Sequence, residues 1–363
     1  MSIGIKSPGK YVQGAGEISN LGRNVKKLAD KFLIVCSPNN IKRIGNDIEE
    51  SMKAVEREYE FYPFGGECTK AEINAIMEKA KETGCNGIIG VGGGKAIDAA
   101  KAAAENLGGL ALAIVPTIAS NDAPCSGVAV IYNEEGVVIK ALITRRNPDV
   151  VLVDTDIIAK SPARLLRAGI GDALATWFEA RACKNSGAKN MARGTCSNTA
   201  YMMARLCYDI LMKDGTQAIA DLEDKKATPA LENVVEANIY LSGVGWESGG
   251  LAAAHAVNDS LVYMSGTHGM YHGEKVAFGT IVQLVLENAP EDEMNEVLSF
   301  MKAAGLPMSL KDLGVTEICE EELRKTAEAA CVPTQSTKNL RADITPEEVY
   351  EAILKADKIG SSF

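Results

Sequence analysis

The histidines are the side chains best suited to chemistry in this chain, because there are only three and they lie close together. His255, His268 and His272 fall within eighteen positions of one another. His268 and His272 are four residues apart, so one face of a helix could carry both. Imidazole is a common ligand for zinc. The cluster therefore indicates a metal site, although histidines at this spacing also occur on solvated helix faces.

A triple glycine, Gly92–Gly94, is the second feature with chemical potential. The apolar run 87–91 precedes it, and Lys95 and a helical pattern follow. Glycines let backbone amides approach an anion, and a helix N-terminus adds a favourable dipole. The P-loop is excluded because Ala96 stands where Ser or Thr would bind magnesium, and the third glycine of the usual dinucleotide fingerprint is missing. The loop therefore indicates either a phosphate site or a plain tight turn.

The first half of the chain alternates short β-rich runs with helical segments. Such alternation predicts a mostly parallel, doubly wound sheet. A helix begins at Thr69, where Thr69 and Glu72 have the spacing of a capping box. The expected strands are 32–36, 59–64, 87–91, 111–115 and 150–153.

An antiparallel hairpin is expected within this half. Residues 128–132 and 137–140 are β-rich, and the four residues 133–136 between them form a turn. Such a hairpin acts either as a flap over a ligand or as decoration of a sheet edge.

After Ser161 and Pro162 the pattern becomes almost wholly helical. Serine at the cap and proline at the first helical position mark the start. We therefore expect an α/β N-terminal domain, residues 1–160, with a mostly parallel sheet, followed by an all-helical C-terminal domain, residues 161–363. The expected helices are 162–184, 192–213, 230–244, 248–262, 270–288 and 291–304.

Composition excludes several classes of function. Apolar residues make up 46% and charged residues 24% of the 363 residues, as in soluble globular proteins. Neither a membrane-spanning stretch nor a signal peptide is visible, which favours a cytoplasmic enzyme. The net charge is −10 and the basic residues are dispersed, so a nucleic-acid partner is not expected. The nine cysteines contain no Cys-x-x-Cys pair, and we expect most of them to be buried and reduced.

Several segments resemble one enzyme family. The block Gly92-Gly-Gly-Lys-x-x-Asp98-x-x-Lys101 resembles the signature of the iron-containing alcohol dehydrogenase superfamily. Residues 116–126, which read Pro-Thr-Ile-Ala-Ser-Asn-Asp-Ala-Pro-Cys-Ser, resemble its glycerol dehydrogenase branch, as do 245–258 and 272–279. The resemblance covers nearly the whole chain in the expected order.

The resemblance implies that the N-terminal domain binds NAD. It places these residues at the dinucleotide: Gly92, Gly93, Gly94, Lys95, Asp98, Thr117, Ser120, Ser126, Val128 and Tyr132. One position departs from the family pattern, because Ser37 stands where the branch commonly has an acidic residue suited to the ribose hydroxyls. Lys42 or Arg43 could attract a 2′-phosphate there, so NADP stays open beside NAD.

The resemblance also assigns the metal ligands. Asp172, His255 and His272 match the three ligands of the glycerol dehydrogenases, which implies one Zn²⁺ per subunit with positions open for substrate. Thr176 stands where iron-dependent relatives usually add a histidine, which favours zinc. His268 is expected either behind the metal ligands or on the pocket wall, and a purely structural role is equally open.

The activity implied is zinc-dependent, NAD-linked oxidation of glycerol and related 1,2-diols to dihydroxyacetone. Asp122 resembles the substrate-binding carboxylate of the family; its ordinary structural role would be an Asx-turn cap, and the two roles can coexist. His255 is expected to contact substrate as well as metal. No proton acceptor is identifiable. Relatives of this type often form octamers, so a homo-oligomer is expected.

Two other functions fit parts of the sequence. A relative acting on a phosphorylated substrate, such as glycerol-1-phosphate dehydrogenase or dehydroquinate synthase, needs cationic side chains around that substrate. Lys275 is the only lysine or arginine between residues 245 and 279. A catalytically silent nucleotide- or metal-binding protein is disfavoured, because the glycine loop, Asp122 and all three ligands occur together.

Overall fold

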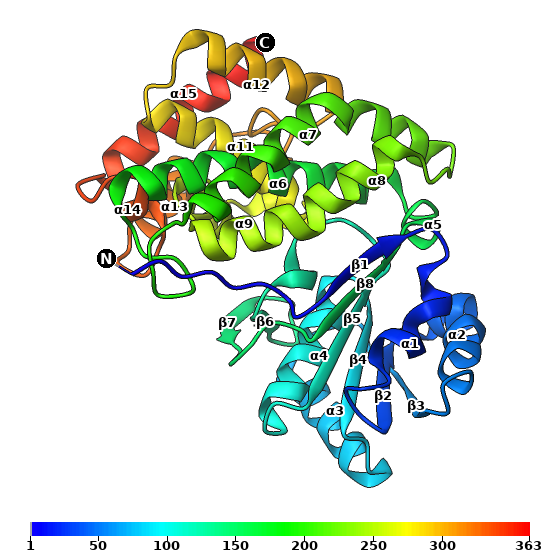
Figure 1. The fold of residues 1–363 in the computed structure, drawn as a ribbon. Coiled ribbons are helices and arrows are strands. Elements are labelled where there is room, and N and C mark those ends of the chain that lie inside the picture. Colours follow the sequence, from blue (N-terminus) through cyan, green and yellow to red (C-terminus); the bar gives the residue numbers. More distant parts are fainter. Residues whose placement is uncertain (1) are drawn as a thin grey trace.

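The computed structural model describes residues 2–363, and its first half is built on a six-stranded parallel sheet (Figure 1). The strands follow the order β1-β8-β5-β4-β2-β3, and every neighbouring pair is parallel. They are β1 (Tyr11–Gly14), β2 (Lys31–Cys36), β3 (Glu58–Pro63), β4 (Gly87–Gly92), β5 (Ala111–Pro116) and β8 (Val150–Asp154). The five expected strands are confirmed. The edge strand β1 was not predicted, because it is short and carries no apolar run.

Helices bury both faces of this sheet, which explains why its central strands read as continuous apolar runs. Phe32 and Ile34 of β2 pack with α2 (Pro38–Lys53), while Leu33 and Val35 face α3 (Lys70–Thr83) and α4 (Gly94–Asn106). The short α1 (Leu21–Val25) lies on the α2 side. The predicted fold class, a parallel α/β domain followed by a helical domain, is confirmed.

The start of α3 follows only half of the expected capping box. The Thr69 hydroxyl accepts a hydrogen bond from the Glu72 amide at 3.2 Å. The Glu72 carboxylate does not return to the Thr69 amide, because it accepts from the backbone of Gly65 at 2.7 Å. Glu72 thus ties the helix to the preceding loop instead.

The expected hairpin is present as a separate two-stranded antiparallel sheet. It consists of β6 (Val128–Tyr132) and β7 (Val138–Ile143), and β7 starts one residue later than predicted and extends further. Ala129 and Ile131 point inward and are buried. The hairpin packs against α4, beside the main sheet (Figure 1).

The second half is helical. The last strand of the sheet ends at Asp154 and the first long helix begins at Ala163, on either side of the expected boundary at residue 160. The helices are α5 (Thr155–Ile158), α6 (Ala163–Ser186), α7 (Asn198–Glu223), α8 (Pro229–Glu236), α9 (Ser242–Gly249), α10 (Ala253–Ser260), α11 (His272–Leu286), α12 (Glu291–Ala304), α13 (Glu320–Ala330), α14 (Thr337–Leu340) and α15 (Pro346–Ser362). A π-helical turn, Ala237–Leu241, joins α8 to α9.

Three predicted helix boundaries were wrong. Ser161 does not cap α6, whose N-cap is Pro162. The helix expected at 192–213 begins at Asn198, where the Ser197 hydroxyl accepts from the Ala200 amide, and it continues to Glu223. The break expected between 244 and 248 falls instead at Gly250, whose φ of 114° belongs to the region that favours glycine.

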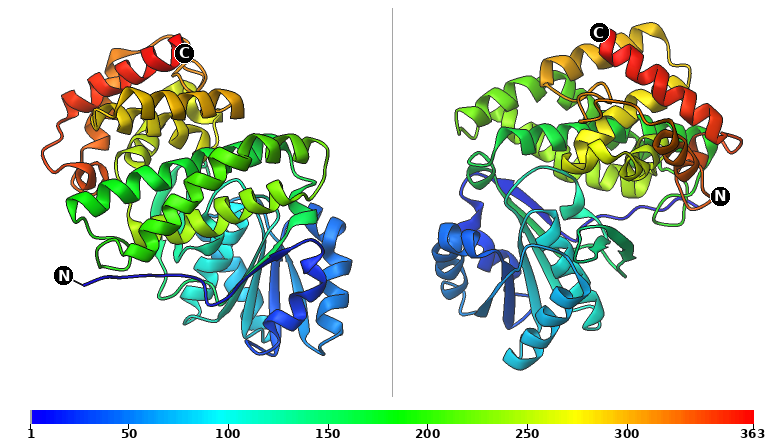
Figure 2. Two further views of the ribbon diagram at one scale, coloured as in Figure 1. Left: turned by 45° about the horizontal axis from the view of Figure 1, so that its top comes forward. Right: turned by 180° about the vertical axis from the view of Figure 1, so that it is seen from behind.

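The helical half lies over the carboxyl ends of the strands (Figures 1 and 2). The loop after β5 contains a short 3₁₀ turn, Ala123–Cys125, which packs against α9. The beginning of the chain also joins the halves, because Ile3 bridges to Thr195 before the chain enters β1. A site at this edge of the sheet can therefore draw residues from both halves.

Most cysteines are buried and reduced, as predicted. Seven of the nine cysteines are buried, whereas Cys319 is exposed and Cys331 is half-buried, and all nine are free thiols. Within residues 2–363, no helix combines the length and the apolarity that crossing a membrane would require.

Candidate active site

Three helices bring the predicted metal ligands together. Asp172 lies in the middle of α6, His255 in the first turn of α10, and His272 is the first residue of α11. The Nε2 atoms of His255 and His272 lie 3.3 and 3.2 Å from Asp172 Oδ1. One ligand atom from each residue falls within 4.8 Å of the others. The chain thus forms a compact group of one carboxylate and two imidazoles.

The geometry of these three donors fits a metal ion. Asp172 is buried, and within the described part of the chain neither of its oxygens has a hydrogen-bond partner of acceptable geometry. Such orphaned acceptors are rare and call for a ligand. In a tetrahedral zinc site with bonds of about 2.0–2.2 Å, neighbouring ligand atoms are roughly 3.3–3.6 Å apart. The observed separations of 3.2 and 3.3 Å suit that arrangement.

The electrostatics of the group also favour a cation. Burial alone would raise the pKa of Asp172, but the charges of His272 and His255 hold it below its ordinary value. Burial opposes the charged form of His255, yet Glu179 and Asp172 raise its pKa well above the usual range. Two carboxylates enclosed in the protein therefore attract positive charge, which either protons or a divalent metal can supply.

Two glycines allow the helices to approach closely enough to form this group. A Cβ at Gly273, next to His272, would lie 1.8 Å from the carbonyl oxygen of Ala168 on α6. A Cβ at Gly169 would lie 2.0 Å from the carbonyl oxygen of Ala119. Because any side chain would force these backbones apart, both glycines position the site without touching a ligand.

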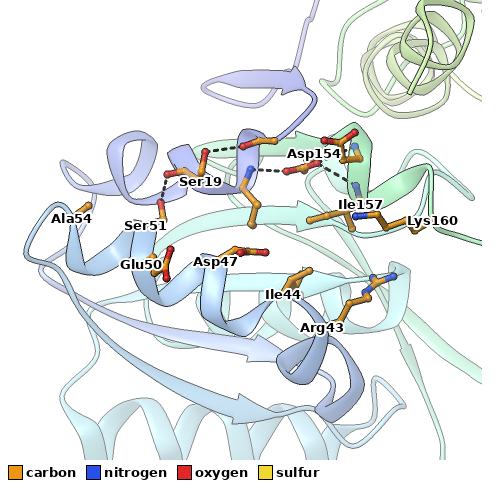
Figure 3. A pocket seen from close by; sticks show the side chains of 13 residues that line it. Ser19, Arg43, Ile44, Asp47, Glu50, Ser51, Ala54, Asp154, Ile157 and Lys160 are labelled. Atoms are coloured by element: carbon orange, nitrogen blue, oxygen red, sulfur yellow. Dashed lines mark hydrogen bonds between the residues drawn. The ribbon is translucent and has the colours of Figure 1, made fainter. Parts of the chain in front are cut away.

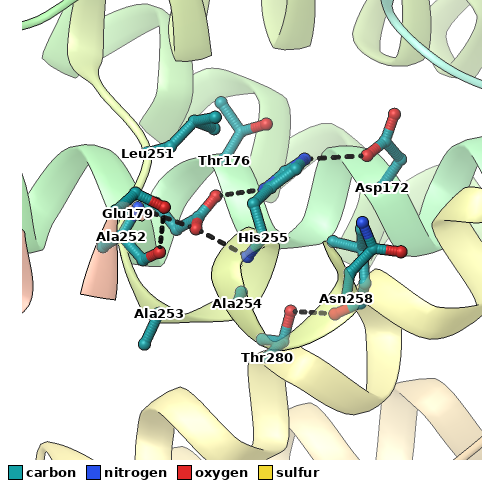
Figure 4. Close-up of polar contacts among 12 residues, drawn as sticks. Asp172, Thr176, Glu179, Leu251, Ala252, Ala253, Ala254, His255, Asn258 and Thr280 are labelled. Atoms are coloured by element: carbon teal, nitrogen blue, oxygen red, sulfur yellow. Dashed lines mark hydrogen bonds and ion pairs between the residues drawn. The ribbon is translucent and has the colours of Figure 1, made fainter. Parts of the chain in front are cut away.

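Each histidine ligand has its own polar neighbour, and Figure 4 shows the neighbour of His255, which is Glu179. The Nδ1 of His255 lies 2.6 Å from an oxygen of Glu179, which is fully buried on α6. The Nδ1 of His272 lies 3.1 Å from the side-chain nitrogen of Asn258. Sequence reasoning missed both neighbours. The signal for Glu179 was its place seven residues after Asp172, on the same face of a helix.

The predicted substrate residue, Asp122, sits beside the metal group. It is buried on the loop after β5, and burial together with the charge of Asp172 raises its pKa to about 7. The Ser242 hydroxyl donates to Asp122 Oδ2 at 2.6 Å. Since Ser242 has one proton to give, the Thr176 hydroxyl, 2.9 Å away, then donates to Ser242. These two hydrogen bonds leave the other oxygen of Asp122 free to accept a third.

The predicted cofactor loop follows β4 directly. Gly93 is the N-cap of α4 and has no side chain to cap the helix. The first amides of this 13-residue helix therefore lack a side-chain partner. Free amides at a helix N-terminus suit a phosphate group. The Gly92 carbonyl accepts from the Thr117 amide at 3.0 Å, which fixes the loop after β5 against the glycines. A Cβ at Gly94 would lie 3.1 Å from the side chain of Asn121.

Two of the predicted cofactor residues, Asp98 and Ser126, form hydrogen bonds that hold the hairpin and its connecting loop. Asp98 Oδ2 accepts from the Val130 amide at 3.0 Å, and its other oxygen lies 3.4 Å from Lys101 Nζ. Lys101, almost fully buried, also donates to the carbonyl oxygens of Ala123 at 2.5 Å and Val128 at 2.8 Å, and lies 3.3 Å from the Ser126 hydroxyl. Asp98 and Ser126 are thus placed to orient the hairpin and its connecting loop.

The remaining predicted cofactor residues lie on elements that adjoin β4 and the glycine loop. Lys95 Nζ forms an ion pair with Glu67 and lies 5.4 Å from the centre of the Tyr132 ring. Ser120 is partly exposed on the loop after β5. Ser37 follows β2 and is the N-cap of α2, where its hydroxyl accepts from the Asn40 amide at 3.3 Å.

Two further features lie outside the metal ligands and the glycine loop. His268 is exposed in a 3₁₀ turn, and its Nε2 lies 3.0 Å from the carbonyl oxygen of Val262, which favours the structural role. A cavity of about 560 Å³ lies between α2 and the carboxyl end of β8 (Figure 3). Among its polar groups, Asp154 serves the fold, because it accepts from the amides of Ile18, Asp156 and Ile157.

Comparisons with known proteins agree with this geometry. A family model described as iron-containing alcohol dehydrogenase matches residues 8–155. The chain is 50% identical to glycerol dehydrogenase of Escherichia coli O6:H1, over 99% of this chain and 98% of that one. It is 47% identical to glycerol dehydrogenase of Pseudomonas putida, over 100% and 99%. The crystal structure of glycerol dehydrogenase from Schizosaccharomyces pombe superposes with a TM-score of 0.95 at 37% identity, covering 99% of this chain and 92% of that one.

Proposed function

The chain belongs to the glycerol dehydrogenase family of oxidoreductases, and on this premise we propose that it oxidises glycerol and related 1,2-diols to hydroxyketones, with NAD and one zinc ion as cofactors. The observation that carries this proposal is the group formed by Asp172, His255 and His272, in which both imidazole nitrogens lie 3.2–3.3 Å from the carboxylate, beside the buried Asp122. The product from glycerol would be dihydroxyacetone.

The two cofactors divide the chemistry between them. When bound, a divalent metal stabilises the negative charge that develops on the alcohol oxygen, and nicotinamide accepts the hydride. Asp172, His255 and His272 would hold the metal. The amides at the start of α4, together with Lys95, would hold the pyrophosphate.

The protein's own residues orient the substrate. With one oxygen of Asp122 occupied by Ser242, the other can accept a hydrogen bond from a polyol hydroxyl. An alcohol without a second hydroxyl would leave the buried Asp122 carboxylate unpaired, which costs binding free energy. The site therefore favours diols. The hairpin held by Lys101 lies beside the proposed cofactor site and would exclude water from it.

A phosphorylated substrate finds little support at this position. The main electrostatic influences on Asp122 come from Asp172, His255 and His272, together with the Ser242 hydroxyl. A phosphate dianion would need lysine or arginine side chains there. The buried carboxylates favour an uncharged polyol over an anion.

The test is reduction of NAD by glycerol at alkaline pH, measured before and after chelation and again after zinc is added back. We expect turnover that chelation abolishes and zinc restores. Repeating the assay with NADP defines the cofactor. Two further substrates, propane-1,2-diol and dihydroxyacetone, define the substrate range and the direction of the reaction. Absence of turnover on all three substrates, with zinc demonstrably bound, would refute the proposal. Light scattering on the same preparation tests the homo-oligomer, which together with a cytoplasmic location remains part of the proposal.

A further inference from the structure

The two proposed histidine ligands differ in what holds them. The ring of His255 is buried, and its Nδ1 meets the Glu179 carboxylate at 2.6 Å. The ring of His272 is 43% exposed, and its Nδ1 lies 3.1 Å from the side-chain amide of Asn258. The Asn258 oxygen is buried without a partner, and turning the amide over places this oxygen where it accepts the Nδ1 proton. A carboxylate beside a ligating imidazole fixes the tautomer and strengthens the ligand more than an amide does. The difference makes His255 the better-defined ligand.

Glu179 is itself fixed by the backbone of α10. Its Oε1 accepts hydrogen bonds from the amides of Ala252 at 2.8 Å and His255 at 3.0 Å, which caps the start of that helix. Its Oε2 is thereby left for the imidazole of His255. The carboxylate accepts hydrogen bonds only, so His255 Nδ1 must carry the proton. Nε2, which faces Asp172, is then the nitrogen that a metal ion would bind in place of a proton.

We propose that Glu179 is the positioning residue of the metal site, which sets the tautomer and orientation of His255 so that Nε2 can bind zinc. The proposal rests on the proposed function, since it needs a metal at Asp172, His255 and His272. It goes further by assigning a role to a residue that makes no contact with the metal position. Glu179 also joins α6 to α10, and so couples two of the three elements that carry ligands (Figure 4).

The substitution Glu179→Gln tests this role sharply. The two backbone amides at Ala252 and His255 require an oxygen, so the glutamine oxygen takes the place of Oε1. Its NH₂ group then faces His255 Nδ1 and donates to it. The imidazole must respond by carrying its proton on Nε2, where it blocks the metal. Glu179→Ala is less informative, because it also removes the helix cap.

The measurement is the zinc affinity of the full chain, by competition with a chromogenic chelator. Wild type, Glu179→Gln and the matched control Glu247→Gln are compared. Glu247 is equally buried and also accepts from a backbone amide, that of Gly127 at 3.1 Å, but it meets no histidine. We expect zinc to bind E179Q about 10- to 100-fold more weakly than wild type, and E247Q to bind it as wild type does.

Two further readouts separate positioning from general stability. In a His255→Ala background, E179Q should not weaken zinc binding further, because the two residues act through one ligand. Long-range ¹H–¹⁵N NMR reports the protonated ring nitrogen directly, and the chain has only three histidines to assign. At saturating zinc, wild-type His255 should carry its proton on Nδ1. In E179Q, before zinc is added, the proton should lie on Nε2.

The outcomes distinguish this inference from the proposed function. If wild type binds zinc and E179Q binds it equally well, or keeps the proton on Nδ1, Glu179 has no positioning role while the proposed function stands. The positioning role is likewise overturned if E179Q weakens binding equally with and without His255. If wild type binds no zinc at this site, both proposals are overturned.

Discussion

The two halves of the candidate site are constructed in opposite ways. The proposed phosphate-binding part of the cofactor half uses the backbone of one continuous segment, in which β4, the glycines and the start of α4 follow one another directly. The metal half uses side chains from α6, α10 and α11, which are far apart in the chain. The first depends on local conformation and the second on the packing of three helices. A substitution that disrupts one half should therefore leave ligand binding by the other half intact.

Charge separates the halves as well. Lys95 is exposed beside the glycine loop, and the buried Lys101 lies behind it. The metal half contains the buried carboxylates of Asp172 and Glu179. Under the proposed function, an anionic dinucleotide and a divalent cation would be attracted to different ends of the site, and a neutral substrate would lie between them.

The largest expected effect comes from breaking the helix packing of the metal half. In Gly273→Ala, the new Cβ would meet the Ala168 carbonyl at 1.8 Å, so α11 must move away from α6. We expect a loss of about 3 kcal/mol in the free energy of unfolding, with zinc affinity lowered more than about 100-fold. Thermal unfolding and chelator competition measure the two effects.

Gly269→Ala is the matched control for this change. It lies four residues earlier, and a Cβ there meets nothing within 4 Å. It should leave both stability and zinc affinity unchanged. Normal zinc binding by Gly273→Ala would show that the metal half does not depend on this contact. NAD binding, followed by fluorescence titration, should persist in whatever fraction of the variant is folded.

A smaller effect is expected from disturbing the cofactor half. Lys101→Met leaves the Ala123 and Val128 carbonyls without their donor and Asp98 without its cation. We expect a loss of about 2–3 kcal/mol in stability and a raised KM for NAD, because the hairpin is no longer held. Zinc affinity should not change.

Lys81→Met serves as the control, since Lys81 is exposed on the neighbouring helix α3. Denaturant unfolding and steady-state kinetics compare the two variants. A fall in zinc affinity in Lys101→Met, without loss of fold, would contradict the independence of the two halves.

The smallest effect is expected at Ser37, where the cofactor half departs from the family pattern. Ser37→Asp keeps an N-cap for α2 and adds a carboxylate suited to the ribose hydroxyls but repulsive to a 2′-phosphate. We expect the ratio of kcat/KM for NADP to that for NAD to fall about tenfold, which corresponds to about 1.4 kcal/mol.

Ser37→Asn isolates the charge in this comparison, because asparagine matches aspartate in shape and also caps helices. It should leave the ratio as in wild type. An equal fall in both variants would assign the effect to shape, and no change in either would place the ribose away from Ser37.

The local features were largely predictable from the sequence. The central strands of the sheet are apolar runs buried on both faces, and the hairpin carries alternating inward residues with turn residues between them. The glycine loop lies where a strand meets a helix, as its sequence indicated. Boundaries in the helical half were less predictable. Ser161 was predicted to cap a helix and does not, whereas Ser197, which was not predicted as a cap, begins α7.

The sequence by itself determined the fold class, the three histidines and the aspartate that could bind a metal, and the loop that could bind a phosphate. Those properties follow from residue type, from periodicity over a few turns and from the resemblance of whole motifs. Only the tertiary structure decided that Glu179 meets His255, that Ser242 holds Asp122, and that Asp98 serves the hairpin. These pairings join segments distant in the chain, and their geometry depends on helix contacts as close as that at Gly273. No local pattern encodes such an approach, because it exists only once the helices are packed.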